Sequence, residues 1–212
     1  MMDQFQRILV LSPHTDDGEL GCGGTLSRFV SEERCVFYAA FSSAEKSIPP
    51  GFERDALKKE VRQATAVIRI PPSQLTLLDY PVRDFPQHRQ EILEDMIRLR
   101  NHINPDLVLL PSTADTHQDH QTISQEGFRA FKQSTMLGFE LPWNNLTFQT
   151  AGFVALEEAH VDCKVRAIQC YQSQAHRDYS QEEFVRGLAR TRGTQIGSRY
   201  AEAFEVIRWV IR

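Results

Sequence analysis

The feature that most constrains the fold is the alternation of short apolar runs with longer amphipathic stretches over roughly the first 130 residues. The apolar runs have the length of buried strands and predict strands at 8–11, 35–41, 75–78 and 106–110. The amphipathic stretches predict helices at 25–33, 53–68, 86–103 and 122–132. Alternating strands and helices favour a mostly parallel sheet with helices on both faces, so we predict the α/β class.

The remaining third of the chain is less regular but also contains predicted strands and helices. It predicts strands at 147–156 and 204–211 and helices at 162–172 and 181–194. No internal repeat, low-complexity tract or linker interrupts the pattern. A length of 212 residues suits one domain. We therefore expect a single domain over residues 1–212.

Composition removes several classes of protein. The chain is 41% hydrophobic and 25% charged, which is ordinary for a globular domain and argues against disorder or coiled coil. A net charge of -4 gives no sign of nucleic-acid binding. The apolar run at 8–11 is too short for a signal-peptide core or a membrane span. The four cysteines show no CxxC spacing, so we expect free thiols and a cytoplasmic location.

Two polar clusters follow two of the predicted strands. The cluster after the strand at 8–11 contains His14, Asp16 and Asp17. The cluster after the strand at 106–110 contains His117, Asp119 and His120. Ligands of open α/β sheets bind outside the carboxyl ends of the strands. We therefore expect both clusters at one edge of the sheet, at strand ends that could be neighbours.

These residue types suit a catalytic metal. Zinc accepts imidazole and carboxylate, and a catalytic zinc takes three protein ligands and leaves a position for water. The clusters supply such a set and leave groups over for a general base and an oxyanion donor. A plainer alternative is that Asp16 and Asp17 cap a helix while the histidines are solvated loop residues. The joint occurrence at two corresponding strand ends favours a site.

A glycine-rich segment follows the first cluster and includes Gly18, Gly21, Gly23 and Gly24. It does not match the dinucleotide pattern G-x-G-x-x-G, because Leu26 stands at the last position, and no lysine follows to make a phosphate-binding loop. We interpret the glycines as small residues that let the first turn of a helix approach the sheet and the metal site closely.

The sequence also resembles a known family. The segment Pro13–Thr25 resembles the "PHPDDxExGxGG" signature of the PIG-L/LmbE-like zinc-dependent N-acetylglucosaminyl deacetylases. His117-Gln-Asp-His120 resembles their "HPDH" motif, and 171–174 and 200–204 resemble their "YxSQ" and "YAEGF" stretches. The motifs follow the family's order along nearly the whole chain. The resemblance implies a Rossmann-like three-layer sandwich, the LmbE-like/PIG-L deacetylase fold.

The resemblance also implies roles for the two clusters. The residues that would bind Zn²⁺, or Fe²⁺ in its place, are His14, Asp17 and His120. Asp16 would be the general base that deprotonates the attacking water. His117 would be protonated, stabilise the tetrahedral oxyanion and assist departure of the amine. Asp119 would hydrogen-bond to a neighbouring histidine and hold its orientation.

Departures from the family pattern concern the metal loops and one arginine. Thr15 and Gln118 stand where the family has proline, but neither side chain is expected to touch the metal. The family often carries an arginine three residues before a glutamate on the second helix. If Glu60 is that glutamate, the arginine position holds Leu57. Arg54, one turn earlier, could point into the cleft instead, or be a solvated arginine at a helix end.

Further candidates for substrate binding lie late in the chain. Trp143 could stack on a sugar face, and its alternative is a core tryptophan in an irregular segment. The arginines on or near the last helix, Arg190, Arg192 and Arg199, could meet a phosphate. For these three we favour a solvated helix face.

Together these features predict zinc-dependent hydrolysis of the acetamide of an N-acetylated sugar or sugar conjugate, with acetate and a free amino sugar as products. A zinc amidase acting on another N-acyl group is an alternative, as is a non-catalytic sugar-binding protein on the same fold. The expected partner is a small N-acetylated sugar, with no nucleic acid and no membrane span. The aglycone stays open, and so does assembly into a homo-oligomer.

Overall fold

A computed structural model describes residues 5–211, so the ends of the predicted domain (1–4 and 212) lie outside the described residues. One seven-stranded sheet runs through the molecule in the order β3-β2-β1-β4-β5-β7-β6. The strands are β1 (Arg7–Ser12), β2 (Cys35–Ala40), β3 (Leu75–Leu77), β4 (Leu107–Pro111), β5 (Thr135–Phe139), β6 (Gly152–Leu156) and β7 (Tyr200–Arg208). Among these seven strands, β7 alone runs opposite to the others, so its pairs with β5 and β6 are antiparallel while the remaining pairs are parallel. The predicted α/β class with a mostly parallel sheet is confirmed.

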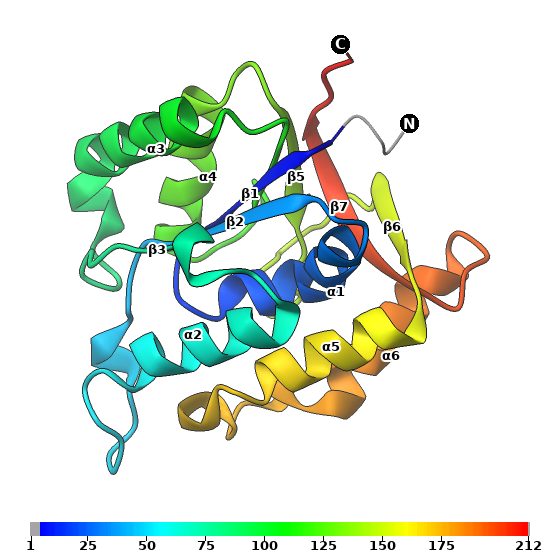
Figure 1. The fold of residues 1–212 in the computed structure, drawn as a ribbon. Coiled ribbons are helices and arrows are strands. Elements are labelled where there is room, and N and C mark those ends of the chain that lie inside the picture. Colours follow the sequence, from blue (N-terminus) through cyan, green and yellow to red (C-terminus); the bar gives the residue numbers. More distant parts are fainter. Residues whose placement is uncertain (1–4, 212) are drawn as a thin grey trace.

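Helices cover both faces of the sheet (Figure 1). The helices are α1 (Asp17–Ser31), α2 (Ala56–Ile68), α3 (Arg89–Ile103), α4 (Gln118–Ala130), α5 (Glu158–Ile168) and α6 (Glu182–Thr194). One layer consists of α1, α2, α5 and α6, and the other consists of α3 and α4. Five short 3₁₀ turns (Glu45–Ser47, Pro72–Gln74, Phe85–His88, Gln172–Gln174 and Asp178–Ser180) lie in the connections.

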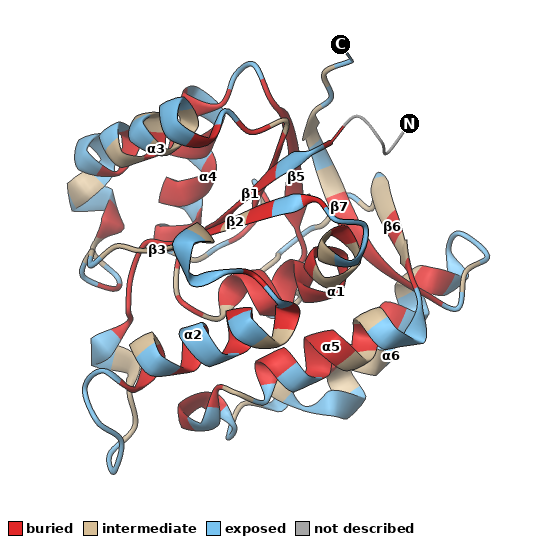
Figure 2. Cartoon of the chain, viewed as in Figure 1, coloured by how far each residue is buried: buried red, intermediate tan, exposed pale blue. Residues whose placement is uncertain are grey.

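The four central residues of strand β1, 8–11, are all apolar because both of its faces are covered. Ile8 and Val10 belong to the core under α1 and α2, whereas Leu9 and Leu11 belong to the core under α3 and α4. Successive side chains of a strand point to opposite faces, so a strand covered on both sides is apolar throughout. Figure 2 shows the result as a buried sheet between helices with exposed outer faces.

The sequence pattern missed strand β5 and placed the starts of three helices too late, including α5, which begins at Glu158 rather than 162. β5 contains Gly138, which weakens a strand signal, but a Cβ at this position would lie 3.0 Å from the Cα of Ser112, the residue directly after the neighbouring strand β4. Helix α4 begins at Gln118 rather than 122, inside the expected polar loop. Helix α1 begins at Asp17 rather than 25, so the glycine-rich segment is helical.

The glycines of α1 pack closely against the sheet, as the sequence analysis predicted. The close packing extends beyond the first turn of the helix. A Cβ at Gly18 would lie 2.5 Å from the hydroxyl of Tyr38, and one at Gly21 would lie 2.4 Å from the ring of Phe139. Helix α1 bends at Cys22, whose φ of -144° is not helical. Small side chains therefore bring the loop before α1 close to the strand ends.

A matched pair of glycine substitutions tests this packing. We expect Gly21→Ala to lower the free energy of unfolding by about 1–3 kcal/mol, because the added methyl overlaps a buried ring. Gly187→Ala in α6 meets nothing within 4 Å and should raise stability by up to about 1 kcal/mol through helix propensity. Urea unfolding followed by circular dichroism measures both values. Equal effects of the two substitutions would contradict the packing argument.

Among residues 5–211, none of the helices combines the length and apolarity that crossing a membrane requires.

Candidate metal centre and active-site cleft

The two polar clusters meet where the strand order reverses. Strands β1 and β4 are hydrogen-bonded parallel neighbours, while β2 and β5 lie on their outer sides. The loops that leave the carboxyl ends of β1 and β4 therefore diverge and leave a crevice between them. The prediction that both clusters lie at one sheet edge, on neighbouring strands, is confirmed.

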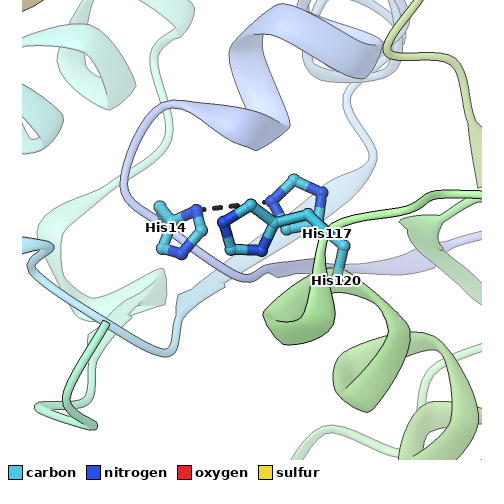
Figure 3. A group of neighbouring side chains, drawn as sticks. All are labelled: His14, His117 and His120. Carbon is cyan, nitrogen blue, oxygen red and sulfur yellow. Dashed lines mark hydrogen bonds between the residues drawn. The ribbon is translucent and has the colours of Figure 1, made fainter. Parts of the chain in front are cut away.

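Three atoms in this crevice form a nearly equilateral triangle. Nδ1 of His14 lies 3.1 Å from Oδ2 of Asp17, and Nε2 of His120 lies 3.3 Å from the same oxygen. The two nitrogens are 3.3 Å apart, and Figure 3 shows the imidazoles turned toward one another. A tetrahedral zinc with ligand bonds of about 2.0–2.1 Å separates its ligand atoms by roughly 3.3 Å. The donor set therefore fits such an ion.

A carboxylate holds the outer nitrogen of each of the two histidines. Nε2 of His14 lies 2.9 Å from Oδ2 of Asp119, and Nδ1 of His120 lies 2.8 Å from Oδ2 of Asp115. Such carboxylates fix the tautomer of a ligating imidazole and orient its other nitrogen toward the metal. The sequence analysis assigned this role to Asp119 but missed Asp115. A signal existed, since Asp115 lies in the same polar loop, five residues before His120.

His117 occupies a different position in the cluster. It is the N-cap of α4, and its Nδ1 accepts the backbone N–H of Asp119 at 3.1 Å. The nitrogens of His14, His117 and His120 lie within 4.8 Å of one another, a looser grouping than the triangle with Asp17. The triangle with Asp17 therefore matches the ligand spacing of a tetrahedral ion more closely than the three histidines do. Because Nδ1 accepts a hydrogen bond, a neutral ring carries its proton on Nε2, which is then free to donate.

The carboxylates of the first loop do not act as helix caps. Asp16 precedes α1, and its side chain makes no capping hydrogen bond. Oδ2 of Asp17 instead accepts the backbone N–H of His14 at 2.8 Å. Asp17 and His120 are buried and His14 is largely buried. The alternative of helix-capping aspartates beside solvated histidines does not describe this loop.

Burial and neighbouring charge shift the pKa values of these groups. Burial opposes the charged form of His14, but Asp17 and Asp119 outweigh it and raise the pKa of His14 to about 9. The pKa of His120 rises to about 10 against the same burial, through Asp17 and Asp115. The pKa of Asp17 falls well below its ordinary value, because the two imidazoles outweigh the effect of burial.

The pKa values of the two other titratable groups in the cluster, Asp16 and His117, shift toward the uncharged form. Burial and the adjacent Asp17 raise the pKa of Asp16 to about 6. Burial, together with His120 and His14, lowers the pKa of His117. The family resemblance implies a protonated His117, whereas this environment and the accepted hydrogen bond favour a neutral ring with Nε2–H.

A cleft of about 270 Å³ opens over the triangle. Its lining includes His14, Asp16, Asp17, His117 and His120, and also Leu57, Arg83, Trp143, Gln174, Arg177 and Tyr179. This volume lies at the small end of ligand pockets and suits a sugar-sized group.

The two predicted substrate-binding residues differ in their position relative to this cleft. Trp143 lines it, is 36% exposed and stacks on Tyr179 with ring centroids 3.9 Å apart. Arg54 is exposed in the turn before α2 and is not among the lining residues, so its role stays a prediction. The arginines among the lining residues are Arg83 and Arg177, which the sequence analysis did not single out.

The late arginines mostly serve the structure. Arg192 forms an ion pair with Glu140, and Arg199 pairs with Glu158. Arg190 donates to the backbone carbonyl of Arg199 at 3.0 Å.

The C-terminal motif at 171–174 forms hydrogen bonds with the loop after β1 and with helix α2. The hydroxyl of Tyr171 donates to the carbonyl of Thr15 at 2.7 Å and contacts Glu19 at 3.1 Å. Ser173 donates to the buried carboxylate of Glu60 through both its N–H and its hydroxyl. These bonds tie the loop after β1 and helix α2 to the segment 171–174.

Glu202 supports α1 beyond its bend. Its carboxylate accepts the backbone N–H groups of Gly24 and Thr25 at 3.0 and 2.6 Å and pairs with Lys164 at 2.6 Å. These N–H groups follow Cys22, whose non-helical φ interrupts α1, so the carboxylate binds the start of the second helical part. The motifs at 171–174 and 200–204 therefore act as supports for the loop that holds the site.

Comparison with known proteins identifies relatives over the same regions. The profile of the PIG-L family, described as GlcNAc-PI de-N-acetylase, matches residues 9–131, more than half of the chain and both polar clusters. Diacetylchitobiose deacetylase of Thermococcus kodakarensis is 22% identical, over 97% of this chain and 84% of its own length.

Solved structures agree with this fold. The structure of a conserved protein of Thermus thermophilus has a TM-score of 0.78 and 26% identity, covering 98% of this chain and 97% of its own. N,N'-diacetylchitobiose deacetylase of Pyrococcus horikoshii, solved with an inhibitor, has a TM-score of 0.80 and 19% identity, covering 97% and 85%. The profile match and this fold together show that the chain belongs to the PIG-L family.

Proposed function

We propose that this protein is a metal-dependent hydrolase that removes the acetyl group from an N-acetylated sugar or sugar conjugate. The observation that carries the proposal is the triangle of His14, Asp17 and His120 with edges of 3.1–3.3 Å, with Asp16 beside it in the cleft. The family description and the deacetylase relative support the same reaction.

The triangle would hold a Zn²⁺ ion, and Fe²⁺ would suit the same ligands. When bound, the ion would supply Lewis acidity, which polarises the acyl carbonyl and lowers the pKa of water to about 7. Asp115 and Asp119 keep the two ligating imidazoles in one tautomer and one orientation.

The remaining side chains of the cleft have separate tasks. Asp16, with a pKa of about 6, accepts a proton from the attacking water and can return it to the amine nitrogen. His117, as a neutral ring with its proton on Nε2, would donate a hydrogen bond to the oxyanion, while the proton that Asp16 returns lets the amine leave. Trp143, stacked on Tyr179, offers an aromatic face to the sugar ring.

Acetate release tests the function directly. We expect the zinc-loaded protein to release acetate from N-acetylglucosamine derivatives, to lose this activity on chelation and to regain it with added zinc. Activity only on a longer N-acyl analogue would favour the alternative of another amidase. Binding of the sugars without any release by the metal-loaded protein would favour a sugar-binding protein.

We also propose a cytoplasmic location. All four cysteines carry free thiols, and two of them, Cys22 and Cys163, are buried. A reducing compartment preserves such thiols.

The missed carboxylate Asp115 provides a further prediction. We expect Asp115→Asn to weaken zinc binding by about 10–100-fold, because the single, uncharged amide oxygen cannot accept from both Nδ1 of His120 and the backbone N–H of His117 as the carboxylate does. Competition with a chromophoric chelator measures this affinity. Asp84→Asn, at a half-exposed position outside the cleft lining, serves as the control and should bind zinc like the wild type. An unchanged zinc affinity in Asp115→Asn would contradict the assigned orienting role.

A further inference from the structure

The side chain of Gln174 has one polar atom left for a ligand. Gln174 lines the cleft but is only 6% exposed. Its backbone N–H donates to the carbonyl of Tyr171 at 2.9 Å, and its own carbonyl accepts the backbone N–H of Arg177 at 3.0 Å. Its side-chain Nε2 donates to Oγ of Ser173 at 3.2 Å. Its Oε1 forms no hydrogen bond with any of residues 5–211.

The direction of the Gln174 amide follows from the protons available on Ser173. A hydroxyl has a single proton, and Ser173 donates it to Oε2 of Glu60 at 2.6 Å. The oxygen of Ser173 can therefore only accept from the amide, so Nε2 of Gln174 must face Ser173. A reversed amide would place two oxygen atoms against each other without a proton between them. Oε1 is thus the atom that Gln174 can offer in the cleft.

A buried carboxylate holds this arrangement in place. Glu60 on α2 accepts the backbone N–H of Ser173 at 2.9 Å as well as its hydroxyl. Both Glu60 and Ser173 are buried. Hydrogen bonds to a charged acceptor are stronger than those between neutral groups, so Ser173 is firmly fixed. The amide bound to it is oriented before a ligand enters, and such an acceptor loses little conformational entropy on binding.

The chemistry of this part of the cleft indicates the kind of donor that Oε1 would accept from. Leu57 lies on the same face of α2 as Glu60, three residues earlier, and also lines the cleft. The two side chains that α2 and the segment 171–174 contribute to the lining, Leu57 and Gln174, are therefore uncharged. A single oriented amide oxygen next to an uncharged surface suits a neutral donor, and the hydroxyl groups of a sugar are donors of this kind.

We propose that Gln174 determines specificity by accepting, through Oε1, a hydrogen bond from one hydroxyl group of the N-acylated sugar. This inference rests on the proposed function and assigns a substrate contact within the same cleft. The motif at 171–174 would then have two tasks, since it also supports the loop after β1. A sugar that lacks this hydroxyl would leave Oε1 without a partner in the complex, which weakens binding of substrate and transition state.

The test uses the zinc-loaded protein with methyl N-acetylglucosaminide and its 3-, 4- and 6-deoxy analogues. We expect one of the three analogues to have a kcat/KM at least about fivefold below that of the parent sugar. Gln174→Met keeps the length of the side chain without its polar atoms and should bring this ratio close to one. Gln172→Met is the matched control, because Gln172 is exposed in the same turn and outside the cleft lining, and should keep the ratio.

A second variant tests the orientation of the amide. Ser173→Ala leaves Gln174 intact but removes the oxygen that holds its Nε2. We expect this variant to discriminate against the same deoxy analogue less than the wild type does, because the amide is no longer fixed. Zinc content and circular dichroism of each variant show whether the metal site and the fold are retained.

A binding measurement separates failure of this inference from failure of the proposed function. Titration calorimetry with methyl glucosaminide and its deoxy analogues requires no turnover. Acetate release with the same ratios in wild type and Gln174→Met would overturn the hydroxyl contact and leave the deacetylase proposal standing. A loss of kcat/KM in Gln174→Met that is equal for the parent and all three analogues would also overturn it. Absence of acetate release, with hydroxyl-dependent binding that Gln174→Met abolishes, would overturn the deacetylase proposal and support the contact.

Discussion

Replacing Asp16 with asparagine should lower kcat for acetate release by ~10²–10⁴-fold while zinc content stays near that of the wild type. The carboxylate lines the cleft beside the triangle but is not one of its three corners. Asparagine keeps the size of the side chain and cannot accept a proton at neutral pH. Asp16, with a pKa of about 6, is the group suited to accept the proton of the attacking water, and the variant lacks this base.

Steady-state acetate release and elemental analysis of the same samples measure the two quantities. Asp55→Asn is the matched control: it is an exposed N-cap of α2, and asparagine caps a helix about as well as aspartate. We expect its kcat to equal that of the wild type. A fully active Asp16→Asn would remove Asp16 from the role of base but would leave the metal assignment intact.

Replacing Asp17 with asparagine should have the opposite signature, with loss of the metal and, as a consequence, of activity. Oδ2 of Asp17 is the corner shared by both short edges to His14 and His120. It also accepts the backbone N–H of His14 at 2.8 Å, so it shapes the loop as well as the site. An amide is a poor zinc ligand and brings no charge to compensate the ion. We expect zinc affinity to fall by more than the ~10–100-fold typical of a residue that only orients a ligand.

Dialysis against defined free zinc, followed by metal analysis and acetate release, measures this effect. Thermal unfolding of the metal-free variant checks that the loop still folds. Stoichiometric zinc at unchanged affinity in Asp17→Asn would exclude Asp17 as a ligand and would favour His117, the third imidazole of the cluster. If Asp16→Asn keeps its zinc and Asp17→Asn loses it, the two adjacent aspartates have different roles, one as base and one as ligand.

Most of the fold could be predicted because its signals are local. The run at 8–11 has the apolar pattern of a strand with two covered faces, and the structure places these residues in two cores. Strand β5 could not be predicted in this way. Its Gly138 weakens strand propensity, and the reason for the glycine is the backbone of Ser112, which is 26 positions away along the chain.

The site was predictable to the extent that its residues cluster in the sequence. His14 and Asp17 lie on one loop, and His120 follows another, so two strand ends sufficed to place them. Arg83 and Arg177 come from separate segments without a motif of their own. Only their common position in the cleft relates them to the metal centre.

By itself, then, the sequence determined the order of the strands and helices apart from β5, and the chemical types available at two strand ends, because hydrophobic periodicity and motif spacing are properties of neighbouring residues. The tertiary structure decided that β1 and β4 are adjacent, and that three ligand atoms stand 3.1–3.3 Å apart. It also decided which charged side chains have partners among the described residues. Asp115 forms a hydrogen bond with His120, whereas Arg83 and Arg177 line the cleft without an ion pair. Such distances and pairings arise from contacts between residues far apart in the chain, which no local pattern encodes.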